Sequence, residues 1–336
     1  GLAASRFPSR GPQLITPFSL IWICCVRDLL YWRDEPEQVK RLLPGIRGTV
    51  DIFDQWRNAD GLLEDVPGWP FIDWVTPDRQ SEEAWKRGVP ACGREGVSAL
   101  VNLVYLLALQ HLSDVERHAG DPESAARATR LSAATATALR QRFWNAQHGA
   151  LQDDDSGQHW SSQAQILGIL TQILSPAEGN QALDRAETEN WVPPSYMFRH
   201  YDFEARRLLG RAGEIFERLD AWQEMIDRGS FTVWEHLEPS RSDCHAWSSH
   251  PLFHLPCSVA GIRPAAPCFA KVDIAPQFGK LTRIPTTISH PRGLVEVDLT
   301  RSGDRVSGSI SLPADTTGTF RFGAETVRLE AGMTQL

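Results

Sequence analysis

Carboxylates and tryptophans gather in three segments of this sequence that have the composition of loops. The segments run over residues 60–74, 229–235 and 241–251, and they hold Asp60, Asp73 and Glu235 among other acids. Two carboxyl groups flanking a sugar can act as a general acid and as a base that activates water. Indole rings stack on the apolar face of a pyranose, and the chain has 12 Trp. The segments therefore indicate a sugar-binding cleft with the groups needed to hydrolyse a glycosidic bond.

A helical scaffold is expected to position these loops. Apolar residues recur at three- and four-residue steps up to about residue 260, which is the period of amphipathic helices. Helices are predicted over 16–31, 36–57 (with a break at Pro44), 94–119, 122–144, 160–174, 176–188, 194–209, 212–228 and 244–260.

Short and long linkers alternate between these helices. Residues 120–122 and 210–212 are tight connections, whereas 58–93, 144–160 and 229–243 are long and rich in aromatic residues. Short linkers join antiparallel helices into hairpins. The pattern predicts an (α/α)6-barrel over residues 1–262, with its long loops on one face. The helices make fewer than six hairpins, so the first hairpin is expected to be missing.

The pattern changes after Gly261. Residues 294–299 alternate with a period of two, and Ser302-Gly303-Asp304 leads into a further alternating run. This is the signature of a β-hairpin. A small antiparallel β-sandwich is predicted for the C-terminal domain, residues 263–336.

Composition excludes several classes of partner. The net charge of −8 leaves no basic face for nucleic acid. The longest apolar run, 97–112, is too short to span a membrane. The six Cys lack a CxxC pair, which argues against a structural zinc site and favours reduced thiols in a cytoplasmic protein. No metal and no organic cofactor are expected, and the oligomeric state stays open.

The loop motifs resemble a known family of glycosidases. Thr232-Val-Trp-Glu235, followed by residues 241–248 (RSDCHAWS), resembles the closing segment of the barrel in the α-L-rhamnosidases of glycoside hydrolase family 78. Asp60-Gly-Leu-Leu, Gly68-Trp69 and Asp73-Trp74 are similar to that family's mid-barrel loop. Residues 6–13 and 285–312 also resemble the family, so the resemblance covers nearly the whole chain.

The resemblance implies hydrolysis of terminal α-L-rhamnosyl residues with inversion of configuration, acting on a rhamnose-containing glycoside or oligosaccharide. In it Glu235 is the general base that activates water. Asp73 is the second catalytic candidate, which positions and polarises, and together with Trp74 it lines the subsite at the cleaved position; His245 contacts the sugar. The further candidates for substrate contact are Trp69, Trp85, Arg241 and Trp247.

One part of the family pattern has no counterpart in the chain. The family's general acid lies on the first helical hairpin, so it is expected upstream of residue 1. This leaves open a catalytically inert carbohydrate-binding barrel, or another exo-glycosidase on the same fold. A polysaccharide lyase is disfavoured, because the chain has only four Tyr and the candidate loops hold no basic cluster.

Simpler interpretations stand beside these roles. Glu235 can be a carboxylate at a helix start, Asp73 a helix cap and His245 a satisfied core histidine. Asp153-Asp154-Asp155 lacks the alternating ligand spacing of a calcium-binding loop, and a solvated turn is predicted there.

Overall fold

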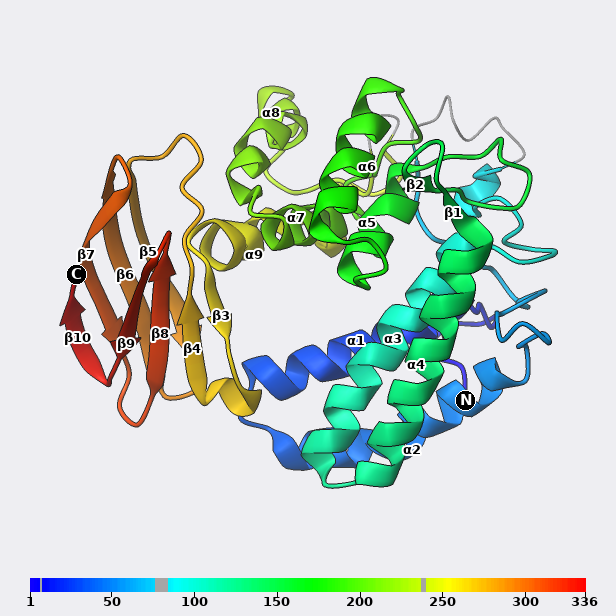
Figure 1. The fold of residues 1–336 in the computed structure, drawn as a ribbon, viewed down its shortest axis with the longest axis horizontal. Coiled ribbons are helices and arrows are strands. Elements are labelled where there is room, and N and C mark those ends of the chain that lie inside the picture. The colour runs from blue at the N-terminus through cyan, green and yellow to red at the C-terminus, as the bar shows by residue number, and fades with distance from the viewer. Residues whose placement is uncertain (7, 76–83, 237–239) are drawn as a thin grey trace. The chain divides into compact units, whose positions relative to one another are not determined.

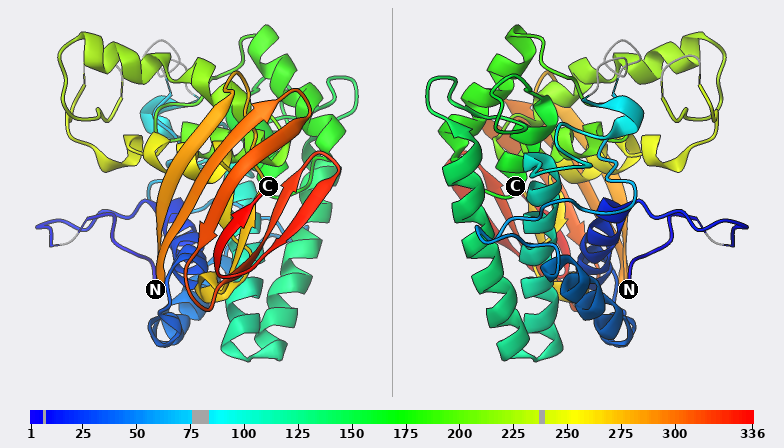
Figure 2. Two further views of the ribbon diagram at one scale, coloured as in Figure 1. Left: turned by 90° about the vertical axis from the view of Figure 1, so that its left-hand side faces the viewer. Right: turned by 90° about the vertical axis from the view of Figure 1, so that its right-hand side faces the viewer.

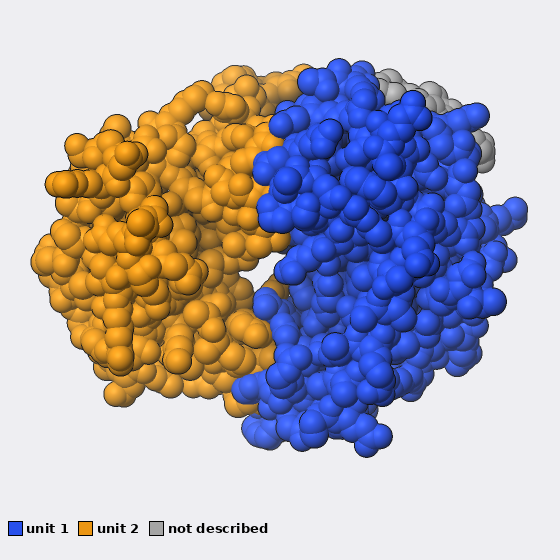
Figure 3. Space-filling model, viewed as in Figure 1, with its two compact units in different colours: residues 1–27, 37–205 blue, residues 28–36, 206–336 orange. Residues whose placement is uncertain are grey.

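The computed structural model describes residues 1–6, 8–75, 84–236 and 240–336. Phe7 of the N-terminal motif, part of the 58–93 loop and residues 237–239 of the third loop lie outside these residues. The chain divides into two compact units (Figure 3). One comprises residues 1–27 and 37–205, and the other comprises 28–36 and 206–336. Each unit is described by itself.

Helices α1 to α6 supply nearly all the regular structure before residue 190 (Figure 1). Their bounds are Thr16–Trp32, Pro36–Asp54, Ala99–Ala119, Pro122–Phe143, Ser162–Leu170 and Pro176–Thr188. A short 3₁₀ helix, η2 (Lys86–Gly88), and a small hairpin of β1 (Trp144–Asn145) and β2 (Ala150–Leu151) lie in the long loops.

Helix α3 is the core of the first unit. Residues 99–109 of this helix are all buried and nearly all apolar, as expected for a stretch of helix with no solvated face. It forms an antiparallel hairpin with α4 (Figure 1). Gly120 ends α3 at φ +83°, a conformation that glycine adopts without strain. Asp121 then caps α4 by accepting a hydrogen bond of 2.9 Å from the Ser124 amide.

The predicted break in the second helix is wrong. Helix α2 runs without interruption through Pro44. It buries Val39, Leu43, Ile46, Val50 and Phe53 along one stripe. The packing of this stripe outweighs the hydrogen bond that a proline removes from a helix interior.

Two helices predicted in the second half are broken into shorter pieces. After α7 (Arg199–Leu208), the predicted 212–228 helix consists of a 3₁₀ turn η3 (Ala212–Arg218) and α8 (Asp220–Asp227). The predicted 244–260 helix divides into η4 (Ala246–Ser248), α9 (Pro251–His254) and a π-helical turn η5 (Leu255–Val259). Pro251 and Pro256 lack the amide hydrogen that a continuous helix needs.

Strands β3 to β10 form two four-stranded sheets, with orders β10-β7-β6-β5 and β3-β4-β8-β9. The first sheet comprises Arg283–His290, Gly293–Ser302, Arg305–Leu312 and Gly332–Gln335 (β5, β6, β7 and β10). The second comprises Ile262–Pro264, Lys271–Ile274, Thr317–Phe322 and Glu325–Leu329 (β3, β4, β8 and β9), and a 3₁₀ turn η6 (Pro267–Phe269) lies between β3 and β4. Figure 2 shows the strands of the first sheet side by side.

Alternation along these strands builds a sandwich core. Val295, Val297 and Leu299 on β6 are buried, and the residues between them are more exposed. The predicted turn is present, because Ser302 pairs with Arg305 across Gly303-Asp304. The sandwich is not wholly antiparallel, since β4 pairs with β8 in parallel. A parallel pair needs a long crossover, and strands β5 to β7 provide it.

The boundary predicted at residue 262 stays a prediction. The last helical turn before the sheets ends at Val259, and β3 begins at Ile262. The described part of the chain contains no helix with the length and apolar character of a membrane span.

Candidate functional site

Asp73 lies at the centre of a buried polar cluster in the first unit. Its side chain is 0% exposed. Gln163 donates from Nε2 to Asp73 Oδ2 at 2.8 Å, and the Ser195 amide donates to the same oxygen at 2.9 Å. The Ser195 hydroxyl donates to Oδ1. Both oxygens of Asp73 are therefore engaged by two segments that are far from it in the sequence.

Helix α5 positions Gln163. Ser161 caps the helix by accepting from the Ala164 amide, which places Gln163 in the first turn. Burial raises the pKa of Asp73 to about 6, although the hydrogen bonds from Ser195 and Gln163 oppose the shift. The carboxylate thus connects the 58–75 loop to α5 and to the 192–196 segment.

Three aromatic side chains close to Asp73 in the sequence form a cluster. The Trp69, Phe71 and Trp74 rings contact one another edge to face, with centroid distances of 5.0 to 5.8 Å. Trp69 Nε1 donates to the Arg87 carbonyl at 3.0 Å. Trp69 and Trp74 are partly exposed. Trp85 is 1% exposed, so its predicted stacking on a sugar stays a prediction that requires the ring to become exposed.

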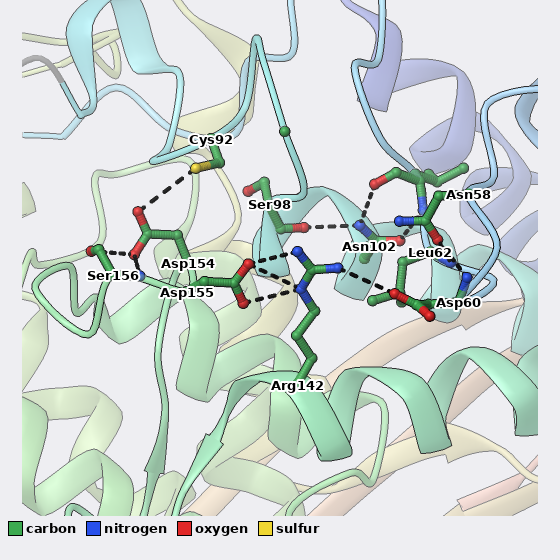
Figure 4. A network of polar contacts seen from close by, with 12 residues as sticks. Asn58, Asp60, Leu62, Cys92, Ser98, Asn102, Arg142, Asp154, Asp155 and Ser156 are labelled. Atoms are coloured by element: carbon green, nitrogen blue, oxygen red, sulfur yellow. Dashed lines mark hydrogen bonds and ion pairs between the residues drawn. The ribbon is translucent and has the colours of Figure 1, made fainter.

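Asn102 of α3 fixes the start of the same loop (Figure 4). Its side chain accepts from the Leu63 amide at 2.7 Å and donates to the Leu63 carbonyl at 3.0 Å. Arg142 of α4 pairs with Asp155 at 2.6 Å and lies 3.7 Å from Asp60. Asp60 is thus at the exposed edge of this network and not in the buried cluster of Asp73.

The prediction of a solvated turn at 153–155 is wrong for two of its three aspartates. Asp153 is 0% exposed and Asp154 is 4% exposed. Asp153 accepts from the Ser161 hydroxyl at 2.7 Å, and Asp154 accepts from Ser156 and pairs with His159. Burial, together with the neighbouring charge of Asp154, raises the pKa of Asp153 to about 7. Asp153 is held beside the first residues of α3 and α5, because its carbonyl accepts from the Ala99 amide at 3.0 Å and its carboxyl group from Ser161. Asp155 stays exposed and pairs with Arg142.

Glu235 lies in a loop of the second unit that closes on itself. Its amide donates to the Ser242 carbonyl at 2.9 Å, and the His245 amide donates to the Val233 carbonyl at 2.8 Å. Trp247 Nε1 donates to the Glu235 carbonyl at 3.0 Å. These bonds make residues 232–235 and 242–247 two arms of one loop, with the Glu235 backbone fixed between them.

The Glu235 side chain is 2% exposed and pairs with Arg241, which is 64% exposed. Arg241 Nε donates to Oε2 at 3.1 Å, and Nη2 donates to Oε1. Burial alone would raise the pKa of Glu235, but the hydrogen bonds and charge of Arg241 outweigh it and hold the pKa below its ordinary value. Among the described residues around it, Glu235 contacts no helix N-terminus, and its partners are Arg241 and the backbone of Ser242.

His245 and Trp247 lie beside this pair. Their ring centroids are 4.2 Å apart, and both side chains are partly exposed. The same loop thus presents an ionised carboxylate, an imidazole and an indole. A carboxylate can accept a proton from water, whereas the rings can contact a sugar.

The sequence analysis identified only some of the residues in these two clusters. Glu235, Arg241, His245 and Trp247 do come together, and so do Asp73, Trp69 and Trp74. Gln163 and Ser195, which hold Asp73, were missed. Ser161 is a helix-capping residue type before an apolar run, and this pattern could have placed Gln163 in the first turn of a helix. Nothing in the sequence near Ser195 indicates that it contacts Asp73.

Comparisons with known proteins identify the C-terminal region. Residues 261–334 match the family model of the bacterial alpha-L-rhamnosidase C-terminal domain. Among curated proteins, none matches the sequence of this chain.

The fold is similar to that of solved rhamnosidases. The family 78 rhamnosidase of Bacillus sp. GL1 superposes with a TM-score of 0.79 at 22% identity, covering 94% of this chain and 34% of that one. The native enzyme of Aspergillus terreus gives 0.76 at 14% identity, over 95% and 38%. The Streptomyces avermitilis α-L-rhamnosidase, solved with L-rhamnose, gives 0.69 at 15% identity, over 95% and 31%.

These likenesses confirm the predicted fold class, an (α/α)6-barrel followed by a C-terminal β-sandwich. The family-model match over residues 261–334 also agrees with the resemblance noted for residues 285–312. The chain spans about a third of the length of the three solved proteins.

Proposed function

We propose that this chain is part of a glycoside hydrolase that removes terminal α-L-rhamnosyl residues with inversion of configuration. The observation that carries the proposal is the match of residues 261–334 to a rhamnosidase domain. The helical region before it belongs to a chain with the fold of solved rhamnosidases. Two of the similar structures are described as holding rhamnose, which supports a rhamnose-containing glycoside as the substrate.

Glu235 is proposed as the general base. Its backbone is fixed by both arms of its loop, and its carboxyl group is ionised well below neutral pH because of Arg241. An ionised carboxylate can take a proton from a water molecule as that water attacks the anomeric carbon.

The remaining roles follow from the chemistry of each group. His245 and Trp247 are proposed as sugar contacts beside Glu235, and Trp69 and Trp74 as sugar contacts within the first unit, because each has an exposed part. Asp73 is proposed as a positioning residue that holds the loop of Trp69 and Trp74 through Gln163 and Ser195. The general acid that protonates the leaving oxygen is expected in a helical hairpin preceding these residues.

Replacing Glu235 tests the proposal in the protein that contains this chain together with that hairpin. Glu235→Gln keeps the size of the side chain but removes the base. Turnover of an aryl α-L-rhamnoside should fall at least about a hundredfold, the low end of what a general base contributes. Calorimetry should show that L-rhamnose still binds.

Glu224→Gln is a matched control, because Glu224 forms an exposed ion pair with Arg228 on α8. It should leave turnover unchanged. Near-normal turnover in Glu235→Gln would refute the role of Glu235. Binding of L-rhamnose by the unaltered protein without any turnover would instead favour the inert carbohydrate-binding barrel.

A further inference from the structure

The ion pair between Glu235 and Arg241 covers the atoms that a general base must use. A carboxylate accepts hydrogen bonds at its two oxygens, and Arg241 donates to both of them. A guanidinium in this two-bond arrangement fills the acceptor positions that face it. The Glu235 side chain is only 2% exposed, so its other acceptor positions are closed to solvent, and a water that Glu235 is to activate must take a position that the guanidinium fills.

Glu235 does not depend on Arg241 for its place in the loop. The Glu235 amide and carbonyl are bonded to Ser242 and to the Trp247 indole. The preceding residue is fixed as well, because Ser248 Oγ donates to the Trp234 carbonyl at 2.5 Å. The backbone that carries the carboxylate is therefore held by neighbours other than the guanidinium.

Arg241 is suited to move away from Glu235. Its side chain is 64% exposed, whereas that of Glu235 is 2% exposed. A guanidinium has five donors and no acceptor, so it can exchange a carboxylate for the hydroxyl oxygens of a sugar. Arg241 would then make the ion pair with Glu235 in the absence of sugar and contact the sugar when it binds, as the resemblance implies for Arg241.

We propose that Arg241 is a displaceable clamp on Glu235: it covers the carboxylate in the sugar-free protein and turns to the hydroxyls of the incoming sugar, uncovering the base. This rests on the proposed function of Glu235. Arg241 is thus a positioning residue, which determines when Glu235 can hold the attacking water.

The clamp has a signature in the ionisation of Glu235. Among the described residues, the charges of Arg241, His245 and His236 each lower the pKa of this carboxyl group. Uncovering Glu235 removes the hydrogen bonds of Arg241, so its pKa should rise. A variant at Arg241 keeps both histidines, so a change in the pKa of Glu235 in that variant is due to the loss of the guanidinium.

The test is an NMR titration of carboxyl carbons in the protein that contains this chain together with the preceding hairpin, labelled with ¹³C at glutamate, with Glu235→Gln identifying the Glu235 signal. In the free protein Glu235 should titrate below 4.5, its ordinary value. Saturating L-rhamnose should raise its pKa by about one unit, a tenfold change in ionisation constant. In Arg241→Gln the pKa should already be raised, and L-rhamnose should not raise it further.

Arg241→Lys provides a second variant that keeps the charge but not the two-bond geometry. It should give a pKa between those of the wild type and Arg241→Gln, and thermal unfolding should show that both variants fold. If L-rhamnose binds by calorimetry while the pKa of Glu235 in the wild type stays low, the clamp is not displaced and the proposal is overturned. If L-rhamnose does not bind at all, the proposed function fails, and the clamp fails with it.

Discussion

At the scale of single residues, Asp153 combines complete burial with an oxygen that lacks a hydrogen-bond partner among the described residues. Its Oδ1 accepts from Ser161, whereas Oδ2 has no donor. A buried ionised carboxylate without full compensation is costly. The pKa of about 7 reflects this cost.

The sign of the pH effect follows from this raised pKa. Between about pH 4 and pH 7 the folded chain keeps a proton on Asp153 that the unfolded chain has released. The contribution of Asp153 to stability is therefore fully present below about pH 4 and is lost as pH rises to about 7. The loss is on the order of 4 kcal/mol for a shift of about three units.

Asp153→Asn is expected to remove this dependence, because an amide stays neutral at every pH. The amide adds an unpaired donor at a cost of about 1 to 3 kcal/mol. The variant should thus be less stable than the wild type at pH 4, where the protonated Asp153 keeps most of its contribution, and equally or more stable at pH 8, as measured by urea unfolding at both values. Asp304→Asn, in the exposed β6–β7 turn, is the control. A stability difference between Asp153→Asn and wild type that is the same at both pH values would contradict the account.

Sequence and structure agree unevenly at this scale. Glu235 and Arg241 are six residues apart, so both could be predicted from one local motif. Asp73 and Ser195 are separated by 122 residues, and only the packing of distant segments brings them together. Burial of Asp153 was unpredictable for the same reason, since three consecutive aspartates are typical of a solvated turn.

At the scale of elements, the N-terminus of α5 connects the buried acids to the cluster of Asp73. Ser161 accepts from the Ala164 amide and donates to Asp153, and Gln163 in the first turn of the same helix donates to Asp73. One capping residue therefore serves both a helix and a buried carboxyl group.

Ser161→Ala should destabilise the chain by about 2 to 4 kcal/mol. Loss of the cap costs about 1 kcal/mol, and a buried carboxyl group left without its donor costs about 1 to 3 more. Ser175→Ala is the matched control, because Ser175 caps α6 in an exposed capping box and should cost only about 1 kcal/mol. Chemical unfolding measures both. Equal costs for the two variants would show that the bond from Ser161 to Asp153 contributes nothing.

Helix positions followed from apolar periodicity wherever packing on one stripe dominates, as in α2, α3 and α4. The prediction from periodicity was wrong where prolines interrupt the helix, as before and within the π-helical turn Leu255–Val259. The β6–β7 hairpin was predictable from its two-residue turn. The parallel pairing of β4 with β8 joins strands more than 40 residues apart, and nothing in a local pattern indicates such a partner.

At the scale of the whole molecule, the candidate groups are divided between two compact units. Asp73, Trp69 and Trp74 belong to one unit, and Glu235, Arg241, His245 and Trp247 belong to the other. The chain covers about a third of the solved rhamnosidases that it resembles, and the general acid is proposed to belong to a further helical hairpin. Activity is therefore expected of the protein in which this chain follows the acid-bearing hairpin.

The stereochemistry of the first product tests the central claim most directly. An aryl α-L-rhamnoside is incubated with the protein that contains this chain and the preceding hairpin, and the anomeric signals are followed by ¹H NMR from the start. Direct attack by a water held on Glu235 inverts the anomeric carbon, so β-L-rhamnose should appear first and the α anomer only later, by mutarotation. Appearance of α-L-rhamnose first would contradict Glu235 as the base of an inverting reaction, and no turnover at all would contradict the rhamnosidase assignment.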